Sequence, residues 1–201
     1  TGTINPKNIK GNNSAKPGDV LILTKGLGTG VLKNSVKYAK PEQIFVDALI
    51  NSMCRLNKNA ADAMVNHNAN ACTDVTGFGL AGHAMQLAKA SGVVLNFNVN
   101  ELPYLNGALW AISENLLTRG DKSNRIYTND FVVNKGTIDT QKEHLLYDPQ
   151  TSGGLLISID ESRADLLLKE IKENGDEIAK IVGYVTAPGT EHKAGTIIFN
   201  F

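Results

Sequence analysis

Residues 73–99 place a glycine-containing turn, an amphipathic helix and a half-buried strand directly one after another. The helix is predicted from apolar residues that recur at the spacing of one buried face, namely Leu80, Ala84, Leu87 and Ala88. Gly92 stands just beyond that face and is a typical helix stop signal. Between Val93 and Val99 apolar and other residues alternate, which is the period of a strand with one buried face. A helix followed at once by a strand indicates a mixed α/β chain.

The rest of the chain continues this alternation. Strands are expected at 19–24, 155–159, 178–185 and 195–199, and helices at 41–56, 59–65, 105–116 and 163–173. The polar segments 26–30 and 121–140 are expected to be loops. Residues 1–16 are expected to form an arm or linker, and residues 17–201 a single domain. The expected fold class is α/β, or α+β, a layered domain in which helices cover a mixed sheet.

The turn before the helix at residue 80 carries the first candidate binding site. Asp74 precedes Thr76, Gly77 and Gly79 in this turn. A carboxylate, glycines that allow the backbone to approach a ligand, and the positive end of a helix together suit a metal-bound phosphate. A plainer interpretation makes Asp74 a helix cap and Thr76–Gly77 an ordinary turn. The motif alone leaves both interpretations open.

Two further segments bear on this choice. Residues 148–154 read Asp-Pro-Gln-Thr-Ser-Gly-Gly, and residues 24–32 read Thr-Lys-Gly-Leu-Gly-Thr-Gly-Val-Leu. Together with Thr-Asp-Val-Thr-Gly-Phe-Gly-Leu at 73–80, they resemble in wording and order the carboxy-terminal part of the selenophosphate synthetase (selenide, water dikinase) family. That family lies within the aminoimidazole ribonucleotide synthetase superfamily, whose carboxy-terminal domain is a layered α/β domain. One departure is Gly26, where the family usually has proline.

The resemblance implies an enzyme that uses ATP to convert selenide and water to selenophosphate, with AMP and phosphate as the other products. It also implies Mg²⁺ ions held between the phosphates and several aspartates, of which Asp74 matches the one from this half. Thr76, Gly77 and Gly79 then become candidate nucleotide-binding residues. The reactive cysteine or selenocysteine and its lysine belong to an amino-terminal domain that is missing here. No catalytic residue is therefore expected in this chain, which alone is expected to be inactive, and a homodimer is implied mainly through the missing domain.

Two other functions stay open. One is another ATP-dependent member of the same superfamily with a different phosphoryl acceptor, although the complete 148–154 segment argues against it. The other is a non-catalytic binding or assembly domain, which the retention of Asp74 beside two glycines disfavours.

The remaining candidate residues have plainer explanations. Lys25, between a strand and a glycine-rich loop, could reach a nucleotide phosphate, but a solvated or salt-bridged lysine is favoured. His83 is expected to pack against the sheet, and a turn before a strand is favoured over nucleotide contact for residues 148–154. Packing roles are expected for Cys54, Cys72 and Trp110, and surface positions for His67, His144 and His192.

Composition narrows the classes further. The 201 residues are 42% hydrophobic, enough for one sizeable core, and 20 basic residues balance 20 acidic ones. This balance gives no reason to expect nucleic acid or an anionic membrane as a partner. The sequence has no apolar run of bilayer length and no secretory signal at its start. Its two cysteines are far apart and suggest neither a disulfide scaffold nor a zinc site, so a reduced, cytoplasmic setting is expected.

Overall fold

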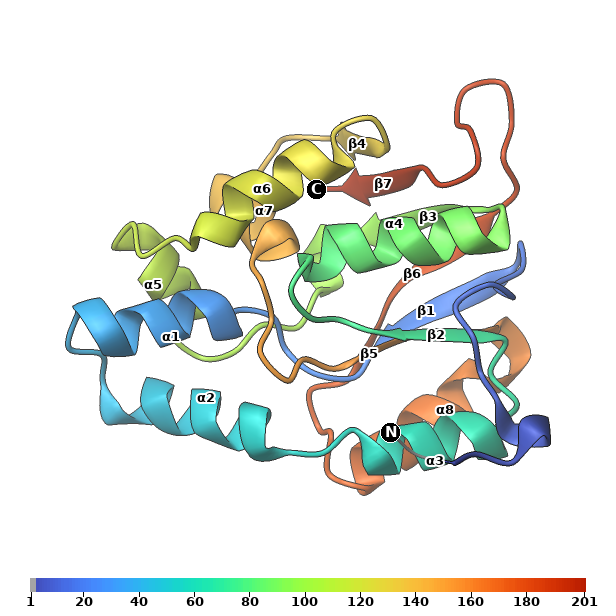
Figure 1. The fold of residues 1–201 in the computed structure, drawn as a ribbon, viewed down its shortest axis with the longest axis horizontal. Coiled ribbons are helices and arrows are strands. Elements are labelled where there is room, and N and C mark those ends of the chain that lie inside the picture. The colour runs from blue at the N-terminus through green and yellow to red at the C-terminus, as the bar shows by residue number, and fades with distance from the viewer. Residues whose placement is uncertain (1–2) are drawn as a thin grey trace.

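The computed structural model describes residues 3–201 and is built on one seven-stranded sheet in the order β2-β5-β1-β6-β3-β7-β4 (Figure 1). The strands are β1 Asp19–Leu23, β2 Ala71–Asp74, β3 Val94–Asn98, β4 Val132–Lys135, β5 Leu155–Asp160, β6 Lys180–Thr186 and β7 Ile197–Asn200. β7 pairs in parallel with β3 and with β4, and the other neighbouring pairs are antiparallel. The prediction of a mixed sheet is confirmed.

Helices cover both faces of the sheet. They are α1 Thr29–Tyr38, α2 Gln43–Cys54, α3 Lys58–Asn66, α4 Gly79–Ser91, α5 Ala108–Ser113, α6 Arg119–Thr128, α7 Thr140–Tyr147 and α8 Glu161–Glu173, with short 3-10 turns at Pro6–Asn8 and Val99–Glu101. α4, α5 and α7 contribute to one apolar core, whereas α3 and α8 contribute to the other and lie together in Figure 1. Strand β1 serves both cores because its side chains alternate: Leu21 and Leu23 enter the first and Ile22 the second.

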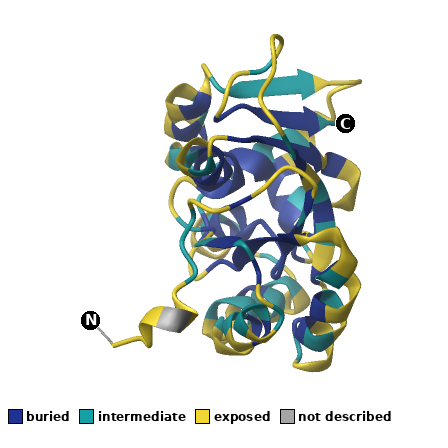
Figure 2. Cartoon of the chain, turned by 90° about the vertical axis from the view of Figure 1, so that its right-hand side faces the viewer, coloured by how far each residue is buried: buried dark blue, intermediate teal, exposed yellow. Residues whose placement is uncertain are grey.

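The first core contains the helical face that the sequence predicts. Leu80, Ala84, Leu87 and Ala88 of α4 are all fully buried. In the same core, Phe97 of β3 and Phe199 of β7 are also fully buried, with ring centroids 5.4 Å apart. Burying such a side chain stabilises the fold by roughly 1.5–3 kcal/mol. Figure 2 shows the buried residues gathered at the sheet and the exposed ones on the outer helices and loops.

The expected loop at residues 121–140 is wrong for most of its length. It contains most of α6, the edge strand β4 and the start of α7. The prediction failed because α6 has no apolar stripe. Its first turn is capped by the Thr118 side chain, which accepts a hydrogen bond from the N–H of Asp121, and the helix is held by paired polar side chains. β4 is recruited by parallel pairing with β7.

Two other boundaries also differ from the prediction. The expected loop at 26–30 ends early because α1, a helix that the sequence analysis did not predict, begins at Thr29, after Gly28 in a left-handed conformation with φ 110°. The expected helix at 105–116 is shortened to α5 by residues with positive φ at each end, Gly107 at 84° and Asn115 at 56°. Backbone reversals of this kind end a helix whatever the apolar spacing around them.

The described part of the expected amino-terminal arm runs along the edge of the sheet at β2. The N–H of Cys72 donates to the carbonyl oxygen of Gly11 at 2.9 Å. The Ser91 hydroxyl at the end of α4 donates to the carbonyl of Asn12 and accepts from the N–H of Ala15, both at 3.1 Å. Within residues 3–201, no helix combines the length and apolar character that crossing a bilayer requires.

Candidate nucleotide and metal site

The turn between β2 and α4 brings two of the sequence motifs side by side. Asp74 is the last residue of β2 and is exposed. The following N–H, of Val75, donates to the carbonyl of Gly154 at 2.8 Å, and the N–H of Gln150 donates to the carbonyl of Thr76 at 3.0 Å. The segment 148–154 therefore supports the turn 74–79 by backbone pairing, although the paired residues are more than 70 positions apart in sequence.

Asp74 does not cap α4. The residue at the amino-terminal cap is Phe78, and no side chain donates or accepts a capping hydrogen bond there. Within the described chain, the Asp74 carboxylate has no hydrogen-bond or ion-pair partner. The Thr73 hydroxyl donates to the backbone carbonyl of Asp74, at 3.1 Å, and not to its side chain. The plainer interpretation of the motif is thus wrong for Asp74, whose charge stays uncommitted at the protein surface.

Thr76 is fixed by a buried histidine. The hydroxyl oxygen of Thr76 lies 3.1 Å from Nε2 of His83, which is buried on the first turn and a half of α4 as the sequence predicts. Burial lowers the pKa of His83, while the negative charge of Asp74 opposes that shift. Because the ordinary pKa of histidine is about 6.5, the ring is neutral at pH 7 and shares a neutral hydrogen bond with Thr76.

The two glycines of the turn have different roles. A Cβ added to Gly77 would meet open space, so its backbone is accessible to a ligand. Gly79 has φ +66°, and a Cβ there would lie 2.9 Å from the carbonyl oxygen of Leu146, at the end of α7. Gly79 therefore permits close packing of α4 on α7.

Asn124 of α6 is a positioning residue that the sequence analysis missed. Its buried side-chain amide donates to the carbonyl of Gly77 at 3.0 Å and to that of Tyr147 at 2.9 Å. It thus ties the turn to α7. No signal in the sequence marks it, since it lies 47 residues from Gly77 in a segment expected to be a loop.

The 148–154 segment has the structural role that the sequence favours, and more. The side chains of Asp148 and Gln150 cap the amino end of α1. Asp148 Oδ2 accepts from the N–H of Gly30 at 3.0 Å and from that of Val31 at 3.3 Å. Gln150 Oε1 accepts from the N–H of Gly28 at 3.0 Å and from that of Thr29 at 3.1 Å. Burial raises the pKa of Asp148 to about 7, although these hydrogen bonds act in the opposite direction. The amino end of α1 is therefore occupied by protein groups.

Lys25 differs from its predicted solvated or salt-bridged state. The residue is 4% exposed, and its Nζ donates to the carbonyl oxygens of Arg55 at 2.6 Å, Ser152 at 3.1 Å and Ser52 at 3.3 Å. Burial lowers the pKa of Lys25, and the nearby Asp176 carboxylate partly offsets that effect. The ammonium joins the end of α2 to the segment before β5.

The cysteines and histidines also depart in part from expectation. Cys72 is buried as predicted, and burial together with the Asp74 charge raises the pKa of its thiol to about 12, but Cys54 is exposed at the end of α2. The three histidines expected at the surface, His67, His144 and His192, are partly exposed. Two of them are also paired: His67 Nε2 lies 2.7 Å from Glu170, and His144 Nδ1 lies 2.9 Å from Asp121. Trp110 packs against the first core beside Phe45, at 5.5 Å between ring centroids.

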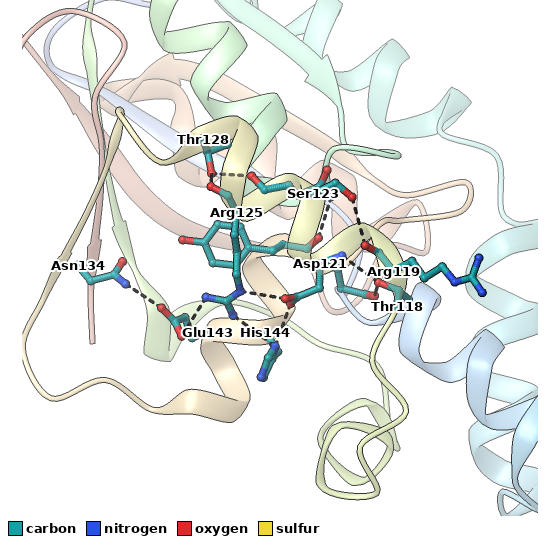
Figure 3. A network of polar contacts seen from close by, with 12 residues as sticks. Thr118, Arg119, Asp121, Ser123, Arg125, Thr128, Asn134, Glu143 and His144 are labelled. Atoms are coloured by element: carbon teal, nitrogen blue, oxygen red, sulfur yellow. Dashed lines mark hydrogen bonds and ion pairs between the residues drawn. The ribbon is translucent and has the colours of Figure 1, made fainter.

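A polar network between α6 and α7 holds the other side of the turn (Figure 3). Arg125 lies at its centre, with Nε 2.9 Å from Asp121 and a terminal nitrogen 3.1 Å from Glu143. Glu143 also accepts a hydrogen bond from the Asn134 amide at 2.9 Å. The guanidinium carbon lies 4.2 Å from the centre of the Tyr147 ring. This network stabilises α6 in place of an apolar stripe.

Comparison with known proteins decides the family. The family model described as "AIR synthase related protein, C-terminal domain" matches residues 16–193, most of the chain. The chain belongs to this AIR synthase related family. A selenide, water dikinase of Clostridioides difficile (strain 630) is 40% identical over 192 residues, which are 96% of this chain and 55% of that relative. The chain thus spans about half the length of the curated relatives that it matches.

Solved structures show the same fold for this AIR synthase related domain. A crystal structure of the hydrogenase maturation protein HypE in complex with ATP matches 98% of this chain and 52% of its own, with TM-score 0.71 and 18% identity. The thiamine monophosphate kinase of Aquifex aeolicus matches 95% of this chain and 52% of its own, with TM-score 0.57 and 19% identity. The expected resemblance to the carboxy-terminal fold of this superfamily is confirmed.

Proposed function

We propose that this AIR synthase related chain is the carboxy-terminal domain of an enzyme that makes selenophosphate from selenide, ATP and water. The proposal is supported by relatives at about 40% identity that are named selenide, water dikinase. Because the chain spans about half of their length, the proposed enzyme also includes an amino-terminal half, which carries the reactive residues and the main contact of a homodimer. A cytoplasmic location and inactivity of the isolated chain belong to the same proposal.

The uncommitted carboxylate of Asp74 carries the proposal. It is a hard oxygen donor of the kind that Mg²⁺ prefers, it is exposed, and it stands at the end of a rigid strand. In the part of the chain that the structure describes, no cluster of three or more His, Cys, Asp or Glu forms a complete metal site. Asp74 would therefore hold Mg²⁺ together with phosphate oxygens and groups from the other half, and that ion would neutralise phosphate charge during phosphoryl transfer.

The chain's own residues would position the nucleotide around Asp74. The Thr76 hydroxyl is held by His83, so its orientation is fixed before a ligand arrives. The open side of Gly77 would admit a phosphate close to the backbone, and the amino end of α4 would add a partial positive charge. Gly79 would act by setting the packing of α4. Lys25, whose Nζ already donates to three carbonyls, would act indirectly by holding the 148–154 segment in place through Ser152.

The deciding experiment replaces Asp74 in the intact enzyme. We expect Asp74→Asn to lower selenide-dependent formation of AMP by about 100-fold or more, because a lost metal ligand weakens stabilisation of the phosphate charge. Calorimetry should show weaker binding of ATP in the presence of Mg²⁺. Asp165→Asn is the matched control, since Asp165 is exposed on α8, which packs on the opposite face of the sheet. Unchanged magnesium-dependent binding and turnover in the Asp74 variant would refute the metal role.

A second candidate is an ATP-dependent enzyme of the same superfamily with another acceptor. The fold similarity to a thiamine monophosphate kinase keeps this candidate open. Formation of AMP from ATP that requires selenide would exclude it. A domain without catalytic role, the third candidate, predicts instead that Asp74→Asn has no effect on turnover.

A further inference from the structure

The helix α1 presents a basic stripe to a cleft next to the 148–154 segment. The residues that line the cleft recur at positions i, i+3, i+4, i+7 and i+8 of the helix, namely Gly30, Lys33, Asn34, Lys37 and Tyr38. Residues at this spacing occupy one face of a helix. The opposite face of α1 enters the first core through Val31 and Leu32, so the basic stripe is the face left free by packing.

The cleft is closed on the other side by the start of α6. Thr118, its amino-terminal cap, and Arg119, its first residue, line this wall, and Pro149 forms part of the floor. The cleft has a volume of about 510 Å³, which suits a small molecule. Figure 3 shows the Arg119 side chain extended away from the polar network, whereas Asp121 is turned into it. The Asp121 carboxylate, in the first turn of α6, is thus directed away from the cleft.

The charges around the cleft are unbalanced. Lys33, Lys37 and Arg119 line it, and none of its lining residues is acidic. Within residues 3–201, none of the three cations forms an ion pair, and Lys37 Nζ lies over the Tyr38 ring, 4.8 Å from its centre. A hydrogen bond with Lys37 and the charges of Lys37 and Arg119 lower the pKa of Tyr38. The positive charges of α1 and α6 therefore both reach the Tyr38 hydroxyl. The amino end of α6 adds to this positive field.

We propose that this cleft binds a small molecule that carries linked phosphate groups. Two lysines and an arginine provide charge-assisted donors for phosphate oxygens, and the three positive charges match a pyrophosphate better than a single carboxylate. Leu117 and Tyr38, which is 65% exposed, offer apolar surface for a ring attached to the phosphates. The balanced net charge of the chain makes the cleft a local feature rather than part of a generally basic surface.

The test titrates the 201-residue chain with pyrophosphate and with ADP, without Mg²⁺, while amide resonances are followed by NMR. Without the metal, no ion can hold a phosphate on Asp74, and the amide resonances of Gly77 and Gly79 report separately on phosphate at the turn 74–79, so binding in the cleft is distinguished from the proposed function. We expect shifts at Lys33, Asn34 and Arg119, and an affinity that falls as salt is added, because exposed charges are screened. A larger affinity for ADP than for pyrophosphate would add ring recognition to the site.

The double substitution Lys33→Gln with Arg119→Gln should weaken pyrophosphate binding about tenfold, because charge-assisted hydrogen bonds are lost. The matched control is Lys122→Gln with Lys172→Gln, which removes the same charge from exposed positions outside the cleft. Asp74→Asn should leave this binding unchanged. The proposal is overturned if pyrophosphate shifts no cleft resonance, or if the control weakens binding as much as the double substitution does. Thermal melting of each variant confirms that it is folded.

Discussion

At the scale of single residues, the environment of each polar group decides its role more than its type does. Asp74 and Asp148 both precede glycine-containing segments, yet one is exposed without a partner and the other is 1% exposed and accepts hydrogen bonds from two backbone N–H groups. Only the first is available to a ligand. The second is a structural group whose ionisation is linked to folding.

Stability should therefore depend on pH through Asp148. Its folded pKa, about 7, lies above the ordinary value of 3.8, so between these values the folded state binds more protons than the unfolded state. The free energy of unfolding should decrease by up to about 1.4 kcal/mol for each pH unit as pH rises through this window. Asp148→Asn removes the effect, so its destabilisation should shrink from pH 5 to pH 7.5. Urea titrations at both pH values test this, and an equal difference at both would contradict it.

The glycines of the 74–79 turn provide a matched pair of substitutions. Gly79→Ala should lower the free energy of unfolding by about 1–3 kcal/mol, because it forces an alanine into a left-handed conformation and toward the carbonyl of Leu146. Gly77→Ala, which enters open space, should leave unfolding nearly unchanged but weaken nucleotide binding in the intact enzyme. Thermal unfolding and calorimetry separate the two. A stable Gly79 variant would contradict the packing role.

At the scale of elements, the spacing of apolar residues predicts which residues the core buries. The spacing of polar residues does not predict which elements are joined by side-chain hydrogen bonds. The face of α4 was predicted from apolar residues at helical spacing, and the strand at 155–159 from an apolar run of strand length; all of these residues are buried. α1 and α6 were not predicted, because α1 is capped by Asp148 and Gln150, over 100 residues away, and α6 is stabilised by polar pairing with α7. The same reason hides the carbonyl groups that bind Lys25, whereas Asp74 could be proposed as a ligand from its sequence because its motif is local.

The polar network should determine whether α6 stays folded. Arg125→Met removes the guanidinium shared by the buried Asp121 and the half-buried Glu143, which should cost about 1–3 kcal/mol, because each carboxylate loses a charge-assisted hydrogen bond. Amide hydrogens of α6 should then exchange faster, while those of α8 keep their protection. Lys122→Met, on an exposed position of the same helix, is the control. Equal exchange in α6 for both variants would show that the network contributes little.

At the scale of the whole molecule, β1 and β5 connect the two cores into one unit. Both strands contribute side chains to each core, Leu21 and Ile22 from β1 and Leu156 and Ile157 from β5. We therefore expect a single cooperative unfolding transition. Fluorescence of Trp110, beside the first core, and far-UV circular dichroism should give the same midpoint in urea. Two separate midpoints would show that the layers unfold independently.

The backbone contact between Gly11 and Cys72 bears on how this protein can be trimmed for laboratory work. β2 is the last strand on its side of the sheet, and the arm covers part of its free edge. A version shortened past residue 12 would expose backbone donors that readily pair with a neighbouring copy. Such a preparation would self-associate and precipitate through the exposed edge of β2, the strand that ends at Asp74.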